Sequence, residues 1–115
     1  MKYESSNTYI DKESIYGAAN YQPLPVVLAR GSGAYLWDID DNKYLDMMSA
    51  YSAVSHGHSH PELVDTMHKQ SMKLAITSRA FYTEPFAEYI EYLSKVSRFE
   101  AVLPMNTGAE AVETA

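Results

Sequence analysis

The stretch that decides the predicted fold is Ala101-Val102-Leu103-Pro104-Met105-Asn106-Thr107-Gly108-Ala109-Glu110, near the end of the sequence. Its apolar half, residues 101–105, is typical of a short buried strand, and its polar half is typical of a helix start. A strand that passes directly into a helix is half of a βαβ unit, the building block of parallel sheets. We therefore expect an α/β fold whose other parallel strands lie outside these 115 residues.

The same helix start is a candidate ligand site. Thr107 and Glu110 have the spacing of a capping box, in which each side chain accepts a hydrogen bond from the other residue's backbone. Gly108 would let a ligand approach the backbone closely, and the free N–H groups of a first helical turn attract anions. An ordinary helix cap with nothing bound has the same features, so local sequence leaves both interpretations open.

Helices are expected before that strand. Apolar residues recur at helical spacing over residues 61–75, where Pro61 suits the first turn, and again over residues 85–97. Residues 77–84 are expected to form a loop. A weaker signal predicts a short helix over residues 5–16.

The segment before position 30 is predicted to be extended. Pro23 and Pro25 exclude a helix there, and residues 26–28 are expected to form a short strand. Gly31-Ser32-Gly33 is expected to be a turn.

A β-hairpin is predicted next. Aromatic-rich runs at residues 34–38 and 43–47 flank the turn candidate Asp40-Asp41-Asn42. The small and polar residues 49–60 that follow predict a loop.

This loop contains alternating histidines, His56-Gly57-His58-Ser59-His60, a pattern that raises the question of a metal site. The chain has no cysteine, no second ligand cluster is recognisable, and Gly and Ser are poor strand formers. We therefore expect no metal here, and histidines that make backbone hydrogen bonds.

Two of the ten tyrosines, Tyr21 and Tyr51, lie in predicted loops, where a tyrosine can offer a flat apolar face and a hydroxyl to a ligand. Arg79 could bind a carboxylate or a phosphate. Surface packing and a solvated arginine are the simpler explanations on local sequence alone. No nucleophile with a base and an orienting partner is recognisable.

Composition excludes several classes of partner. Nine basic and fifteen acidic residues give a net charge of −6, which does not suit a nucleic-acid surface. No apolar run reaches the roughly 18 residues of a membrane span. The N-terminus has neither the apolar stretch of a signal peptide nor the character of a transit peptide. We therefore expect a soluble, cytoplasmic protein that binds neither nucleic acid nor membrane.

Several separated segments resemble those of ornithine aminotransferases, and together they run from about residue 16 to the end of the sequence. Marks of the wider class-III aminotransferases are also present. The segments that favour the ornithine enzymes are Tyr16–Val27, Ser49–Val54, Ser78–Tyr82 and Pro104–Ala115; the wider marks are the hairpin at 31–38, Tyr44-Leu45-Asp46, and Gly57-His58 with His60-Pro61.

The resemblance implies the N-terminal part of a fold-type-I pyridoxal-phosphate transferase. Residues 1–76 would belong to a small domain, and residues 77–115 would form the connection to, and the start of, a large cofactor-binding domain. The implied reaction transfers the δ-amino group of L-ornithine to a 2-oxo acid, giving glutamate 5-semialdehyde and an L-amino acid. The family also implies a homodimer or a higher homo-oligomer.

The resemblance assigns roles to individual residues. Gly108 and Ala109 match the turn whose backbone N–H groups hold the phosphate of pyridoxal 5'-phosphate, and Thr107 is adjacent. Tyr21 matches a tyrosine near the substrate carboxylate, and Tyr51 matches one beside the substrate and the cofactor. No metal ligand is implied.

Two departures qualify the resemblance. Ser55-His56 stand where the ornithine enzymes commonly have Asn-Gln, which puts the loop near the substrate in question. The family's cofactor-bearing lysine, an aspartate on the pyridine nitrogen and a carboxylate-binding arginine lie far downstream, and no lysine here matches. We therefore expect these 115 residues to be inactive and to fold poorly alone, and the full-length protein to be active. The unmatched lysines are Lys69, Lys73 and Lys95, while Arg79 and Phe81 match a loop near the family's dimer interface.

Two alternatives stay open. Another class-III aminotransferase, acting on acetylornithine or 4-aminobutyrate, would share the motifs of the wider class. A non-catalytic interaction module could have kept the motifs without the chemistry. The reading frame beyond Ala115 would separate this last alternative from the enzymes.

Overall fold

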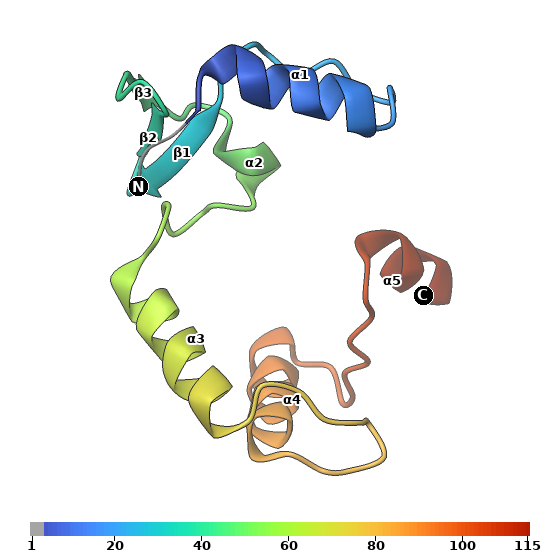
Figure 1. The fold of residues 1–115 in the computed structure, drawn as a ribbon. Coiled ribbons are helices and arrows are strands. Elements are labelled where there is room, and N and C mark those ends of the chain that lie inside the picture. The colour runs from blue at the N-terminus through green and yellow to red at the C-terminus, as the bar shows by residue number, and fades with distance from the viewer. Residues whose placement is uncertain (1–3) are drawn as a thin grey trace. The chain divides into compact units, whose positions relative to one another are not determined.

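The structure, a computed structural model, describes residues 4–115, and this part of the chain divides into two compact units. The first unit ends at Lys73 and the second is Leu74–Ala115. The assignment of residues 1–76 and 77–115 to two domains of a longer protein stays a prediction. The elements are α1 (Ser6–Tyr16), β1 (Leu28–Ser32), β2 (Tyr35–Asp38), β3 (Lys43–Leu45), α2 (Ser49–Ser52), α3 (Pro61–Lys73), α4 (Glu84–Ser97) and α5 (Gly108–Thr114) (Figure 1).

An antiparallel sheet in the order β1-β2-β3 is the centre of the first unit as the structure describes it. The predicted hairpin is confirmed as β2 and β3, with Tyr35 opposite Leu45. The predicted strand over 26–28 is displaced: β1 begins at Leu28 and includes Ser32, which pairs with Tyr35. The expected turn at 31–33 therefore shortens to Gly33 and its neighbour, because a two-residue connection suffices and Gly33 has the positive φ of 56° that glycine tolerates.

The second turn of this sheet is organised by the carboxylate of Asp38, whose exposed fraction is 7%. This carboxylate accepts hydrogen bonds from the backbone N–H groups of Asp40 and Asn42, both at 2.9 Å. It also accepts from Asn42 Nδ2 at 2.9 Å and from the Tyr44 hydroxyl at 2.7 Å. The Tyr44 bond is the largest cause of a lowered Asp38 pKa. The predicted turn residues are thus confirmed, and the last residue of β2 holds them in place.

Cation–π contacts cover one part of the sheet. The guanidinium of Arg30 lies 4.0 Å from the centre of the Trp37 ring, and Lys43 Nζ lies 3.7 Å from the centre of the Tyr35 ring. Both aromatic rings therefore pack against basic side chains.

The predicted helices form, with small changes at their ends. In α1, the Ser5 side chain accepts from Thr8 N–H at 3.3 Å, which satisfies a free donor of the first turn. Gly17 follows the last residue of α1, with a φ of −85°. The helix expected over 61–75 is α3, ending at Lys73, and the helix expected over 85–97 is α4.

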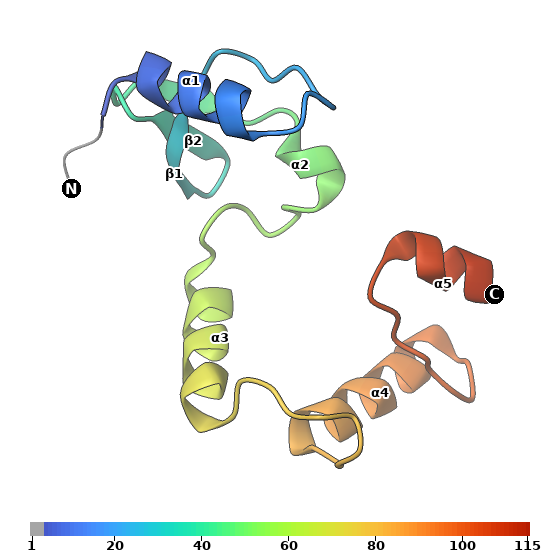
Figure 2. The same cartoon turned by 45° about the vertical axis from the view of Figure 1, so that its right-hand side comes forward.

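The strand predicted over residues 101–105 is wrong for this structure. The segment has no regular secondary structure, and Figure 2 shows it as an irregular trace that connects α4 to α5. A strand needs the backbone of a neighbour, and none of the strands in the described residues pairs with this segment. The helix start after it is confirmed as α5, so the strand-to-helix unit is half formed and the parallel sheet is not present in the described chain.

No apolar side chain is buried in the described part of the chain. The apolar stripes of α3 and α4 exist as predicted, but neither is buried. Met67 of α3 is 68% exposed; in α4, Val96 is 61% exposed while Phe86, Ile90 and Leu93 are half-buried. Burial of apolar surface is the main force that favours folding, so each of these helices needs a partner that the described residues do not supply. None of the described helices combines the length and the apolar character that crossing a membrane requires.

Candidate functional site

The two tyrosines singled out by the sequence lie together. The hydroxyl oxygens of Tyr21 and Tyr51 are 3.4 Å apart, although thirty positions separate the residues. Both side chains are exposed, at 73% and 80%. The hydrogen bond to Tyr21 raises the pKa of the Tyr51 phenol. The pair therefore presents two hydroxyl groups at one point of the first unit, where a polar ligand can reach both.

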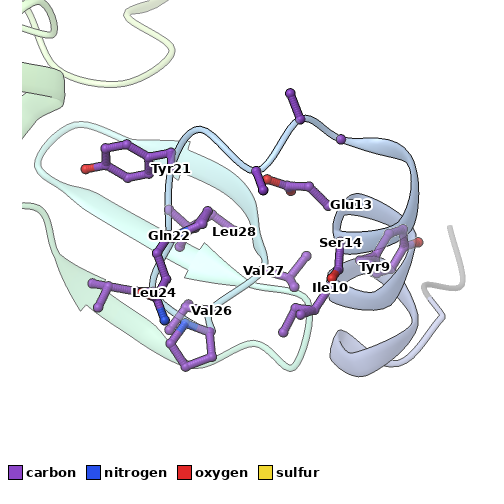
Figure 3. Close-up of a pocket in the computed structure, with 15 residues that line it drawn as sticks. Tyr9, Ile10, Glu13, Ser14, Tyr21, Gln22, Leu24, Val26, Val27 and Leu28 are labelled. Carbon is purple, nitrogen blue, oxygen red and sulfur yellow. The ribbon is translucent and has the colours of Figure 1, made fainter.

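Tyr21 belongs to an extended segment beside α1. This segment and α1 line a cavity of about 580 Å³, to which α1 contributes Tyr9, Ile10 and Glu13 (Figure 3). Pro23 keeps the segment extended, as predicted. In Figure 3 the Tyr21 side chain points away from α1, so its ring lies at the edge of this cavity while its hydroxyl is free to meet Tyr51.

Tyr51 lies on an unusual turn. The four residues of α2 all have positive φ: 48° at Ser49, 46° at Ala50, 56° at Tyr51 and 74° at Ser52. The turn is therefore left-handed, a conformation that costs roughly 1–2 kcal/mol for each residue with a side chain. The small, polar residues 49–60 predict only a loop here. No glycine occurs in these four residues, so composition carries no signal of left-handed backbone.

The carboxylate of Asp46 binds the start of this turn. Its Oδ1 accepts hydrogen bonds from the backbone N–H groups of Met48 at 3.0 Å and Ser49 at 2.9 Å. Its Oδ2 lies 2.7 Å from His58 Nε2. The exposed fractions are 9% for the Asp46 side chain and 22% for that of His58. The bond to His58, followed by the bond from Ser49, lowers the pKa of Asp46.

His58 is itself held on the hairpin. The N–H of Gly33 donates to the carbonyl of His58 at 3.0 Å, and the N–H of His58 donates to the carbonyl of Gly33 at 2.9 Å. A Cβ at position 31 would lie 2.7 Å from the Cβ of His58, so the loop can cross β1 only because Gly31 has no side chain. The expected backbone hydrogen bonds of the histidine loop are thus observed, and the bond from the His58 ring to Asp46 was not foreseen.

The positions of the other two histidines of the loop, His56 and His60, do not indicate a metal site. His56 and His60 have ring centres 6.4 Å apart, and His60 Nδ1 is buried without a hydrogen-bond partner among the described residues. In residues 4–115 no group of three or more His, Cys, Asp or Glu side chains is placed to hold a metal ion. The absence of a metal in the whole protein stays a prediction.

The second candidate region is the start of α5. The capping box predicted from the sequence is confirmed: Thr107 Oγ1 accepts from Glu110 N–H at 3.1 Å, and Glu110 Oε2 accepts from Thr107 N–H at 3.0 Å. Within residues 4–115, no hydrogen bond involves the N–H groups of Gly108 and Ala109. A Cβ at Gly108 would meet nothing within 4 Å. Two backbone donors without a partner among the described residues therefore remain at this helix start, which suits an anion.

The other basic candidates have structural partners. The guanidinium of Arg79 lies 4.8 Å from the centre of the Phe86 ring. Lys69 pairs with Asp65 at 2.6 Å and Lys95 with Glu91 at 2.5 Å, both one helical turn away. These contacts are typical of helix surfaces, and none of them involves the tyrosine pair or the start of α5.

Comparisons with known proteins cover almost the whole chain. The family model "Aminotransferase class-III" matches residues 16–115. The mitochondrial ornithine aminotransferase of Rattus norvegicus is 53% identical over 111 residues, which are 96% of this chain and 25% of that protein. The chain spans about a quarter of the length of the curated relatives it matches.

Solved structures of aminotransferases have the same fold as this chain over the region they share with it. The acetylornithine aminotransferase of Elizabethkingia anophelis superimposes with a TM-score of 0.93 and 52% identity, over 97% of this chain and 29% of that one. An ornithine aminotransferase of Toxoplasma gondii, with pyridoxal phosphate at partial occupancy in its active site, gives a TM-score of 0.92 and 34% identity, over 96% of this chain and 26% of that one. The described arrangement of helices and a small antiparallel sheet is thus that of the N-terminal region of such proteins.

Proposed function

This chain belongs to the class-III aminotransferases, and from that premise we propose that it is the N-terminal part of an ornithine aminotransferase. The full-length protein would transfer the δ-amino group of L-ornithine to a 2-oxo acid, giving glutamate 5-semialdehyde and an L-amino acid. The observation that carries the proposal is the Tyr21–Tyr51 pair, because two of the segments that favour the ornithine enzymes meet there with their hydroxyls 3.4 Å apart.

The tyrosine pair suits a substrate carboxylate. A protonated phenol can donate a hydrogen bond to a carboxylate, and the raised pKa of Tyr51 keeps its proton in place at neutral pH. We assign Tyr21 to the carboxylate of L-ornithine and Tyr51 to the region between substrate and cofactor. Held in this way, the α-amino end of the substrate is fixed and the δ-amino group is left to reach the cofactor.

The start of α5 suits the phosphate of pyridoxal 5'-phosphate. The unused N–H groups of Gly108 and Ala109 would donate to the phosphate, and Thr107 keeps the first turn in place through the capping box. When bound, this cofactor supplies the electron sink on which amino-group transfer depends. The lysine that would carry it is expected downstream of Ala115.

The experiment is a substrate comparison with the full-length protein. We expect kcat/KM for L-ornithine to exceed that for N-acetylornithine and for 4-aminobutyrate by about 100-fold or more. Formation of pyrroline-5-carboxylate, the cyclised product, is measured with 2-oxoglutarate as acceptor. Activity confined to an amino donor other than ornithine would contradict the proposal.

An acetylornithine aminotransferase is the second candidate, because a solved enzyme of that name is 52% identical to this chain. The hairpin and the Gly57-His58 motif belong to the wider class and favour neither substrate. In the same assay this candidate predicts preference for N-acetylornithine. A reading frame that stopped at Ala115 would instead favour the non-catalytic interaction module.

Assembly and location complete the proposal. We infer a homodimer or higher homo-oligomer for the full-length protein, as the family resemblance implies, and light scattering of the purified protein tests it. A cytoplasmic location also stays a proposal, and the rat relative is mitochondrial. Fractionation of the source cells would decide between these compartments.

A further inference from the structure

Resting on the proposed function, we propose that Asp46 and His58 are positioning residues that hold the left-handed turn α2 and thereby fix the Tyr51 hydroxyl beside that of Tyr21. Neither residue contacts a tyrosine hydroxyl, so both would act through the backbone of the turn. Their role would be to set how firmly the amino donor is bound.

The turn, first, needs an external support. All four residues of α2 have positive φ and none is glycine, so the isolated sequence would not favour this conformation. Its own backbone hydrogen bonds run from Tyr51 N–H to the Met48 carbonyl at 3.0 Å, from Ala53 N–H to the Ala50 carbonyl at 3.2 Å, and from Val54 N–H to the Ser49 carbonyl at 3.1 Å. Strained backbone of this kind persists where the surroundings determine it, and such places are often functional sites.

Asp46, second, supplies the support. Oδ1 accepts from two successive backbone N–H groups, those of Met48 and Ser49, directly where the chain enters the turn. Oδ2 is bound at the same time by His58 at 2.7 Å, and this bond opposes rotation of the carboxylate away from the turn. A side chain that accepts from successive N–H groups fixes the direction in which the chain continues.

Both residues, third, are anchored on one rigid element. Asp46 N–H donates to the carbonyl of Ala34 at 2.9 Å, and His58 exchanges two backbone hydrogen bonds with the adjacent Gly33. The connection between β1 and β2 therefore holds both ends of the segment that carries Tyr51. Position 51 is set by the sheet through the Asp46–His58 pair, and not by contacts of its own ring with a core.

The test uses the full-length protein and two variants at position 46. Asp46→Ala removes the acceptor, and Asp46→Asn keeps an amide oxygen that can still accept from Met48 and Ser49. We expect Asp46→Ala to raise KM for L-ornithine about tenfold with little change in kcat, the pattern of a lost binding interaction, and Asp46→Asn to restore most of it.

A matched control is Asp38→Ala. Asp38 also organises a turn of the same sheet, through its bonds to Asp40, Asn42 and Tyr44, but its turn carries neither Tyr21 nor Tyr51. We expect this variant to lower Tm and to leave KM within about twofold of the wild type. If Asp46→Ala lowered Tm but left KM unchanged, as in the control, Asp46 would be merely structural and the inference would be wrong.

A second readout is independent of activity. Hydrogen exchange of the peptide spanning residues 46–54 reports directly on the N–H groups of Met48 and Ser49. We expect faster exchange there in Asp46→Ala, recovery in Asp46→Asn and no change in Asp38→Ala. Should Asp46→Ala not fold, His58→Leu becomes the deciding variant: faster exchange of this peptide, with a KM rise of about threefold, supports the inference, and wild-type values overturn it.

The two hypotheses fail differently. A wild-type protein that transaminates no amino donor contradicts the proposed function, and hydrogen exchange still judges the role of Asp46. A wild-type protein active on ornithine, whose Asp46→Ala variant matches it in KM and in exchange of the turn, contradicts the positioning role alone.

Discussion

The hairpin of the first unit and the segment before α5 in the second unit teach opposite lessons about apolar runs. Residues 35–38 find a partner strand five residues away, at Lys43–Leu45, and the ladder forms. Residues 101–105 are as apolar as many strands, yet they stay irregular because no described strand pairs with them. The difference is the presence of a partner strand: one lies within a few residues in the first case, and none occurs among the described residues in the second.

The largest expected effect is the difference in stability between the full-length protein and residues 1–115 expressed alone. We expect the full-length protein to unfold cooperatively and to be active, and residues 1–115 expressed alone to show no cooperative transition, since no apolar side chain in the described chain is buried. Calorimetry and circular dichroism measure this. A sharp, cooperatively melting monomer of residues 1–115 would contradict it.

Glycine-to-alanine substitutions test whether the backbone is crowded at Gly31 and open at Gly108. In the full-length protein, Gly31→Ala should lower the free energy of unfolding by about 1–3 kcal/mol, because the new Cβ would lie 2.7 Å from that of His58. Gly108→Ala is the control, since its Cβ meets nothing within 4 Å in this structure. Denaturant titration compares the two. Equal losses would show that the close contact at Gly31 is not maintained.

Acid should weaken the first unit more than the second. The pKa of Asp38 is lowered in the folded state, chiefly by the Tyr44 hydroxyl, and that of Asp46 is lowered chiefly by His58. A lowered folded pKa contributes stability that is fully present above the ordinary carboxyl value of about 3.9 and is lost as the pH falls toward the folded value.

The pH dependence can be assigned by two variants of the full-length protein. Asp38→Asn should make the loss of stability below about pH 4 less steep. Glu91→Gln in the second unit should change little, especially at high salt: the pKa of Glu91 is also lowered, by Lys95, but both groups of this pair are exposed. Urea unfolding across the acid range measures both. A steeper acid limb in Asp38→Asn would contradict the sign of this argument.

The smallest expected effect is at the cap of α5. Thr107→Ala removes the acceptor for Glu110 N–H and should cost about 1 kcal/mol of stability in the full-length protein. If the start of α5 binds the cofactor phosphate, affinity for pyridoxal 5'-phosphate falls in the same variant, while Thr8→Ala, a change at the first turn of α1, leaves it unchanged. Affinity is read from the absorbance of the bound cofactor. Unchanged affinity in Thr107→Ala would argue against a role for this cap in phosphate binding.

Two predictions that rest on residues close together in the sequence were confirmed. The capping box needs only Thr107 and Glu110, three residues apart, and it forms as predicted. The hairpin turn needs Asp40-Asp41-Asn42 and the carboxylate two residues before them. The prediction failed at residues 101–105, where the strand depends on a neighbour, and at Ser32, where the length of the ladder decides between strand and turn.

For the candidate site too, the sequence predicted the residues but not how distant residues meet. The residues themselves, Tyr21, Tyr51 and the start of α5, were found from motifs in the sequence. The sequence did not indicate that the tyrosine hydroxyls would lie 3.4 Å apart, nor that Tyr51 would stand on left-handed backbone. It also did not single out the Asp46–His58 bond, for which the one available signal was that both residues lie in motifs of the wider class.

By itself, the sequence determined α1, α3, α4 and the start of α5, the hairpin, the capping box and the family, because each depends on residues close together in the chain or on motifs that can be read directly. Only the tertiary structure decided which distant residues meet: the tyrosine pair, the bond between Asp46 and His58, and the left-handed turn they enclose. The physical reason is that an unfavourable backbone conformation such as that of α2 is stabilised by hydrogen bonds from elsewhere in the fold, and those partners cannot be inferred from the four residues that adopt it.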